Sequence, residues 1–161
     1  MATPTYTLIG STVLSSPASS VTFSGISATG KGDLVLVAET DTGAGIGLTQ
    51  LRFNADAVTE CERVTMFGDG SSATSQSWGG STVEGVRNSS DRVFHRFEIM
   101  DYSATDKNTS GVYRGGAAGN QTLASAFRWK SNSAINSLAI TSGTNQYQAG
   151  STFHLYQIVS E

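Results

Sequence analysis

The sequence predicts an all-β protein, a single-domain antiparallel sandwich of about eight to ten short strands with a jelly-roll-like arrangement. Apolar residues alternate with Ser, Thr and other polar residues in many short runs, which is the period of a half-buried strand. Glycine and small polar residues separate these runs at short intervals. Residues 92–102 have a spacing that also suits a helix, but their Val, Phe and Ile content favours a strand.

Each predicted strand follows from this alternation. Ser15-Ser16-Pro17 separates the first two runs as a tight connection. Leu34-Val35-Leu36-Val37 is a continuous apolar run, which predicts a central strand deep in the sandwich. Leu51 and Phe53 share one face of the next run. In chain order, the predicted strands are residues 6–14, 18–26, 33–40, 48–54, 64–67, 92–102, 122–130, 135–141 and 151–159, with a glycine-rich turn or bulged strand over 108–120.

Residues 68–91 are the longest stretch without clear periodicity. Loops of more than about 12–15 residues are usually functional or disordered, so this stretch is predicted to be a contact loop. Trp78, which lies among Gly and Ser, is its candidate contact residue. Asp69 lies in a glycine-rich turn, where Asp is ordinarily favoured, and a structural role there is preferred to ion binding.

Composition excludes several classes of function. The 161 residues fit one domain, residues 1–161, and only 14% of them are charged, while Ser and Thr make up about a quarter. A formal net charge of −3 with scattered Lys and Arg provides no basic stripe, so no nucleic-acid partner is expected. No window resembles a secretory signal or a membrane span, so we expect synthesis in the cytoplasm and no membrane contact.

The residues that commonly carry catalysis are not arranged for it. His95 and His154 lie in strand-like segments with mainly apolar neighbours, and no nucleophile motif accompanies them. Cys61 lies between Glu60 and Glu62, whose negative charge disfavours the reactive thiolate. Metal-ligand spacings and phosphate-binding loops are missing from the sequence as well. The sequence therefore predicts a protein that is not an enzyme and has no metal or cofactor.

Exposed aromatic residues are the remaining candidates for contacts, because they anchor protein interfaces and stack on sugars. Tyr102 and Trp129 join Trp78 and Asp69 as candidate contact residues. For Trp129 a place in the core or in a subunit interface is favoured.

Several motifs, taken in order, resemble a family of virion proteins of tailed bacteriophages, small jelly-roll modules of marine and environmental phages. The motifs are Tyr6-Thr7-Leu8-Ile9, Val21-Thr22-Phe23-Ser24-Gly25-Ile26, Asp33-Leu34-Val35-Leu36-Val37, Leu51-Arg52-Phe53-Asn54-Ala55-Asp56, Gly68-Asp69-Gly70-Ser71-Ser72 and Ser151-Thr152-Phe153-His154-Leu155-Tyr156. The segment around Cys61 departs from the Tyr-containing version expected there. The resemblance implies a capsid decoration or cement protein, a head fibre, or a module of a tail or receptor-binding protein.

Among these, a decoration protein on the outer capsid surface is favoured, with the major capsid protein as partner and a homotrimer as the assembly. Two expectations support it: the domain fills the chain, and a low charge suits packing into a repeating shell. The alternative is a module that binds a receptor or a host-surface glycan through residues 68–91 and Trp78. A glycan hydrolase would need paired carboxylates, and Glu39, Glu84 and Glu98 are isolated in the sequence.

Overall fold

The structure is a computed structural model, and it describes residues 5–29, 32–43, 47–58, 60–88, 92–117 and 121–158. These residues form twelve strands and no helix. The strands are β1 (Tyr6–Val13), β2 (Ser20–Ser24), β3 (Asp33–Thr40), β4 (Gly47–Phe53), β5 (Cys61–Gly68), β6 (Ala73–Gly80), β7 (Val83–Asn88), β8 (Val93–Met100), β9 (Thr109–Ala117), β10 (Gln121–Trp129), β11 (Ser137–Ser142) and β12 (Thr152–Ile158).

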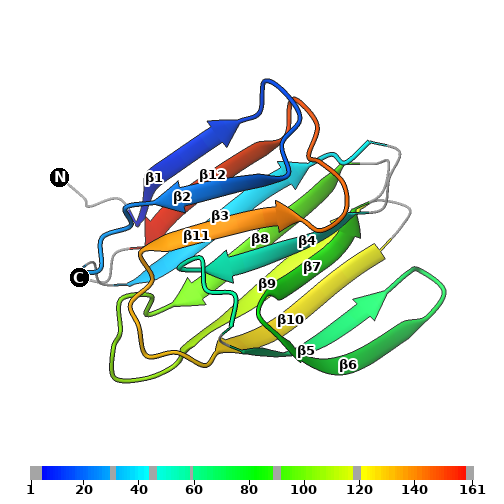
Figure 1. Cartoon of the computed structure of the whole chain (residues 1–161). Helices are drawn as coiled ribbons and strands as arrows, with labels where there is room; N and C mark the ends of the chain where they lie inside the picture. Colours follow the sequence, from blue (N-terminus) through cyan, green and yellow to red (C-terminus); the bar gives the residue numbers. More distant parts are fainter. Residues whose placement is uncertain are drawn as a thin grey trace.

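The strands form two antiparallel sheets that lie face to face (Figure 1). The large sheet has eight strands in the order β1-β12-β3-β8-β9-β10-β5-β6, and the small sheet has four in the order β2-β11-β4-β7. The predicted all-β antiparallel sandwich is therefore confirmed. The prediction of a strand over residues 92–102 is also confirmed, because β8 occupies most of that range.

Eight of the strands are paired in a nested way. β1 pairs with β12 and β3 with β8 in the large sheet, while β2 pairs with β11 and β4 with β7 in the small sheet. This is the folded ribbon of a jelly roll. The other four strands are two antiparallel pairs, β5 with β6 and β9 with β10, and they bring the number of strands above the predicted range.

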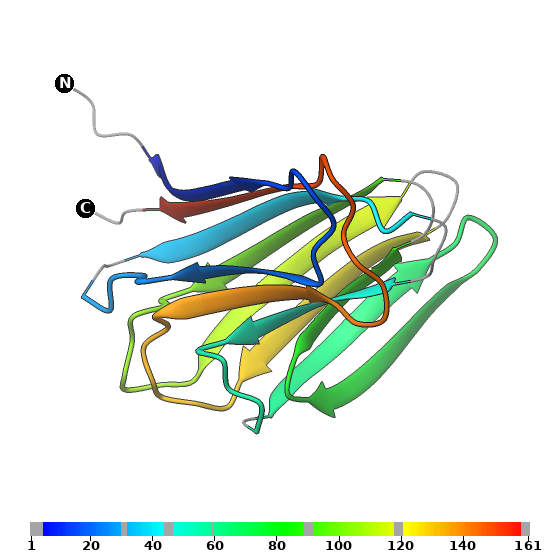
Figure 2. The ribbon, with the colours of Figure 1, turned by 45° about the horizontal axis from the view of Figure 1, so that its top comes forward.

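The two additional pairs widen the large sheet only. β9 pairs with β8, β10 pairs with β9, and β5 joins on the far side of β10. β7, the edge strand of the small sheet, lies over part of β9 and β10, whereas β5 and β6 continue past it (Figure 2). The large sheet therefore overhangs the small one along one side.

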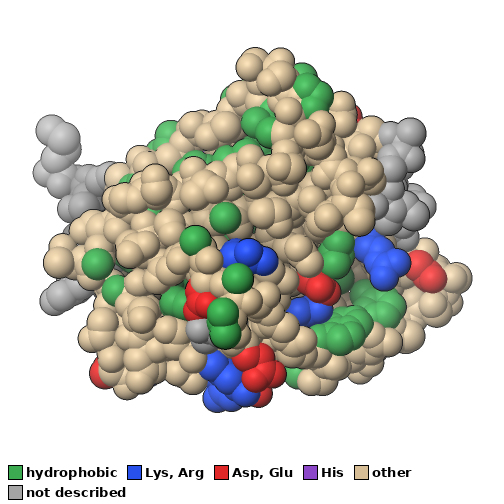
Figure 3. Space-filling model, viewed as in Figure 1, with side chains coloured by type: hydrophobic (Ala, Val, Ile, Leu, Met, Phe, Trp, Pro, Cys, Tyr) green, Lys and Arg blue, Asp and Glu red, His purple; other side chains and the backbone are tan. Residues whose placement is uncertain are grey.

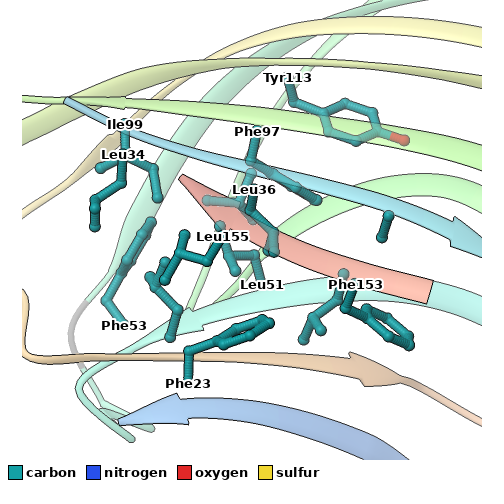
Figure 4. Close-up of a cluster of buried hydrophobic side chains, with 14 of the residues drawn as sticks. Phe23, Leu34, Leu36, Leu51, Phe53, Phe97, Ile99, Tyr113, Phe153 and Leu155 are labelled. Atoms are coloured by element: carbon teal, nitrogen blue, oxygen red, sulfur yellow. The ribbon is translucent and has the colours of Figure 1, made fainter. Parts of the chain in front are cut away.

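The core lies between the sheets and follows from the alternation of the facing strands. The burial pattern of β4 alternates at every residue, and β8 alternates in the same way. β3 lies between β12 and β8, and Leu34, Val35 and Leu36 are at most 1% exposed, which confirms the predicted central strand. Figure 4 shows side chains from both sheets pointing toward one another, namely Leu34, Leu36, Phe97, Ile99, Tyr113, Phe153 and Leu155 from the large sheet and Phe23, Leu51 and Phe53 from the small one.

β9 corrects the prediction of a turn or bulged strand over residues 108–120. Thr109–Ala117 is a regular strand paired on both sides. Its glycines make room for neighbouring rings: a Cβ at Gly111 would overlap the Phe127 ring and the Glu98 carbonyl oxygen, and a Cβ at Gly115 would overlap the Tyr113 hydroxyl. The glycines therefore serve packing in this strand and do not end it.

Candidate functional site

The predicted contact loop over residues 68–91 is largely two strands, β6 and β7, while residues 89–91 lie outside the described part of the chain. Every residue of β6 is exposed, because the small sheet does not reach far enough to cover it. A strand that is uncovered on both faces needs no apolar alternation, so the sequence does not mark it as a strand.

Two of the four candidate contact residues are exposed. Trp78 lies on β6 and is 40% exposed, so it belongs to an edge strand and not to a loop. Asp69 lies in the turn between β5 and β6, where its carboxylate accepts hydrogen bonds from the backbone N–H groups of Ser72 at 2.8 Å and Ser71 at 2.9 Å. These bonds hold the pKa of Asp69 well below its usual range. The carboxylate thus organises its own turn.

The other two candidates are buried, which corrects the prediction of Tyr102 as a surface contact and gives Trp129 a place in the core, one of the two places that the sequence favoured for it. Trp129 is 2% exposed and packs against the Phe53 ring, with the two ring centres 5.3 Å apart. Tyr102 is 1% exposed because the connection after β8 folds back over the end of the core. Its carbonyl accepts the Ile135 N–H at 2.8 Å, and its hydroxyl accepts the Gln157 amide at 3.1 Å. Trp129 thus has the core position that the sequence favoured for it.

The overhang of the large sheet creates a groove beside the small sheet. We call it the overhang groove: its floor is the inner face of β5 and β6, and its wall is β7. It encloses about 380 Å³, and its lining includes Arg63, Thr65, Gln76, Trp78, Glu84 and Arg87. Figure 3 shows hydrophobic side chains beside acidic and basic side chains at the lower right. This is the region where β5 and β6 extend beyond β7.

Arg63 connects the floor of the groove to its wall. Its side chain is only 4% exposed, and its guanidinium forms a hydrogen-bonded ion pair with Glu84 on β7. The guanidinium also donates to the Thr82 carbonyl at 3.3 Å and lies 5.0 Å from the centre of the Trp78 ring, a cation–π contact. Burial lowers the pKa of Arg63, and Glu84 acts against this. The cluster joins residues from three strands into one rigid group.

The sequence did not single out Arg63, Gln76 or Arg87 as functional residues, and it placed Glu84 only as an isolated carboxylate. One signal could have found Arg63: it lies in phase with Cys61 and Thr65, and both are buried. The strand predicted from the sequence begins at residue 64, after Arg63, and therefore leaves this alternation out. A charged residue in phase with buried neighbours indicates a buried ion pair.

The second notable surface is the outer face, which we define as the side chains of the large sheet that point away from the small sheet. Strand pairing aligns these residues in rows across all eight strands. The central row is Leu8, Tyr156, Val35, Glu98, Val112, Ala126, Val64 and Ser77. All but Glu98 and Ser77 are apolar or aromatic. Leu8 and Val64 in this row are 53% and 57% exposed, and Met66 in the neighbouring row is 62% exposed.

Charged residues on the outer face form ion pairs with one another. Glu98 pairs with Arg96 at 2.8 Å and with Arg114 at 3.0 Å, and Glu62 pairs with Arg128 at 2.6 Å. Partial burial opposes ionisation of Glu98, but the hydrogen bonds from both arginines outweigh it and lower its pKa. The outer face therefore combines exposed apolar side chains with charges that are already matched.

Burial or hydrogen bonds hold the two histidines and the cysteine in place. His95 is fully buried: its Nδ1 lies 2.9 Å from the Tyr113 hydroxyl and its Nε2 2.9 Å from the Thr40 hydroxyl, and burial lowers its pKa to about 3. His154 Nδ1 lies 3.0 Å from the Ser11 hydroxyl. Burial raises the pKa of the Cys61 thiol to about 11, although Arg63 acts in the opposite direction. The thiol is therefore protonated at neutral pH.

The carboxylates named as possible hydrolase residues each face a cation. Glu39 pairs with Arg92 at 2.9 Å, Glu84 pairs with Arg63, and Glu98 pairs with two arginines. Within the described ranges, no three His, Cys, Asp or Glu residues gather closely enough to hold a metal ion. The same residues contain no helix long and apolar enough to cross a membrane.

Comparison with known proteins finds no matching family model, no matching curated protein and no matching solved structure. The function of this chain must therefore be argued from its two surfaces, the overhang groove and the outer face.

Proposed function

We propose that the protein is a non-enzymatic virion structural protein of a tailed bacteriophage, a decoration protein that attaches to the major capsid protein on the outside of the shell. It is made in the host cytoplasm and becomes part of the particle there. The observation that carries this proposal is the outer face, which combines exposed apolar side chains with charged side chains that are held in ion pairs. The resemblance in sequence motifs to phage virion modules supports the same function.

The size of the outer face suits a specific protein contact. Eight strands spaced about 4.8 Å apart, with four outward positions on each, cover about 700 Å². A standard interface buries about 800 Å² on each partner, so this one face is large enough for a stable contact. Single apolar residues need no explanation on a protein surface, but the exposed Val64 and Met66 are neighbours on the outer face of β5, and such a cluster favours an interaction.

The charge pattern favours a protein partner over the alternatives. A surface that binds nucleic acid would present unmatched Lys and Arg, whereas Arg96, Arg114 and Arg128 are each paired with a glutamate. Interface cores between proteins are depleted in unmatched charge. The matched pairs allow the outer face to be covered without burying an isolated charge, which would be costly.

Attachment is tested by substituting exposed residues of the outer face. We expect Met66→Lys to lower the number of copies bound to purified particles at least tenfold, because it places an unpaired charge within the interface. Particles that lack the protein are mixed with each variant and sedimented, and the bound copies are counted by quantitative mass spectrometry. Wild-type protein is expected to bind in hundreds of copies.

Val58→Lys is the matched control. Val58 is 89% exposed and lies in the connection between β4 and β5, away from the outer face, so the same chemical change should leave binding intact. Two outcomes would refute the proposal: equal loss in both variants, or a dozen or fewer wild-type copies per particle, which would indicate a tail or vertex protein.

We further propose that the protein is a homotrimer, because closed cyclic symmetry is a common way to bury a self-complementary patch. Light scattering after size exclusion should therefore give a mass about three times that of the chain. A monodisperse monomer at micromolar concentration would contradict the trimer, and it would leave the attachment experiment unaffected.

A further inference from the structure

The overhang groove holds an exposed aromatic ring in a fixed position. The Arg63 guanidinium lies against the Trp78 ring, and yet 40% of Trp78 remains exposed. Trp78 is not stabilising the core, because β6 has no partner sheet over it. A large aromatic side chain that is held in place and left open is typical of a binding site, since aromatic rings supply contact area at low entropic cost.

A contribution to folding stability does not by itself explain why Arg63 and Glu84 form a buried ion pair. A buried ion pair is often no more stabilising than apolar side chains of similar size. What the pair does provide is geometry: it ties β5 to β7 and holds the guanidinium against Trp78. Glu84 also keeps 33% of its side chain exposed, so its carboxylate can accept hydrogen bonds from a ligand in the groove.

The rest of the groove lining combines polar side chains that have planar amide or guanidinium groups with apolar side chains. Gln76 neighbours Trp78 on the inner face of β6, and Arg87 lies on the opposite wall. Among the described residues, none hydrogen-bonds the Gln76 amide. Phe67 and Leu123 add apolar surface to the same groove. Its volume of about 380 Å³ is within the range of small-molecule sites.

We infer that the overhang groove binds a short neutral saccharide. A sugar ring has an apolar C–H face, which stacks on Trp78, and a rim of hydroxyls, which meet the Glu84 carboxylate and the Gln76 amide. We expect a neutral ligand because the buried cation of the groove, Arg63, is already matched by Glu84, whereas Arg87 on the opposite wall is exposed and its charge is screened by solvent. This activity goes beyond capsid attachment, which uses the opposite side of the large sheet.

A glycan array with neutral and anionic arms tests the inference. The neutral arm carries gluco-, manno- and galacto-oligosaccharides, and the anionic arm carries sialylated and sulfated glycans. We expect binding to a subset of the neutral arm. The best neutral probe is then titrated while tryptophan fluorescence is followed. Trp129 is 2% exposed, so a change in fluorescence reports on Trp78.

Trp78→Ala should weaken binding at least tenfold, and Gln76→Ala should weaken it to a smaller extent, while Trp78→Phe should keep much of the affinity. Both positions are exposed on an edge strand, so thermal unfolding should be little changed. Met66→Lys, on the outer face, is the control that should bind the probe normally. The inference is overturned by binding only to anionic glycans, by no binding to either arm, or by binding that survives Trp78→Ala.

Discussion

Gly111→Ala is expected to destabilise the protein by about 3 kcal/mol or more, the upper range for overpacking a protein interior. A Cβ at this position would overlap the Phe127 ring on one side and the Glu98 backbone carbonyl on the other. The ring cannot simply rotate away, because Phe127 is 4% exposed and packs against Phe53. The backbone oxygen can move only if β8 separates from β9. Urea unfolding of wild type and variant measures the difference.

Gly80→Ala is the matched control for this measurement. Gly80 is also a strand glycine, but a Cβ there meets nothing within 4 Å. Its substitution should change the free energy of unfolding by no more than about 0.5 kcal/mol. If Gly111→Ala were equally harmless, the packing described between β8, β9 and β10 would be wrong.

Acid is expected to destabilise the protein through His95. Burial lowers the pKa of its imidazole to about 3, from 6.5 in the unfolded chain. The folded state therefore holds His95 neutral, and unfolding takes up a proton whenever the pH is below 6.5. Stability from this residue is complete above pH 6.5 and is lost as the pH falls toward 3. At pH 4.5 the expected loss is about 3 kcal/mol.

The surroundings of His95 explain why protonation is so unfavourable. The ring lies between the two sheets, with hydroxyls of Tyr113 and Thr40 at 2.9 Å. Burial raises the pKa of Tyr113 and of nearby Tyr147, so both hydroxyls stay protonated and neither supplies a negative charge to offset an imidazolium. The charged ring would be unpaired in an apolar interior.

Between pH 6.5 and 5 the stability loss caused by His95 can be measured apart from the loss caused by the carboxylates. Glu62, Glu98 and Asp69 have lowered pKa values and contribute stability that is lost at more acidic pH. Unfolding free energies measured across this range should therefore fall with pH in wild type and much less in His95→Gln. A direct NMR titration should show His95 ring signals that do not shift until well below pH 5. An imidazole that titrates near 6.5 would disprove the prediction.

The local sequence pattern was sufficient to locate the strands whose inner face is covered by the opposite sheet. In β3, β4 and β8 the alternation or run of apolar residues records which side chains face the core, so their positions were predicted correctly. The sequence pattern does not predict β6 or β7 as strands, and the reason differs between the two. β6 has nothing to bury and thus no apolar period, while the pairing of β7 with β4 is interrupted by a register shift between Leu48 and Gln50.

The candidate site depended on contacts between distant residues. Arg63 and Glu84 become a pair only because β7 of the small sheet packs against β5 of the large sheet, and no local signal connects two residues 21 positions apart. Tyr102 and Trp129 have the composition of contact residues, but the fold buries both. An aromatic residue has the same appearance in a sequence whether it fills a core or lies on a surface.

The chain alone therefore established an all-β antiparallel sandwich, because half-burial imprints a period of two on each covered strand. It also contained the apolar residues of the outer face, such as Val64 and Met66, without showing which side of the strand would be covered. Only strand pairing decided that. By extending the large sheet past the small one, pairing left Trp78 in an open groove. Sheet order is a matter of long-range contacts that no local pattern encodes.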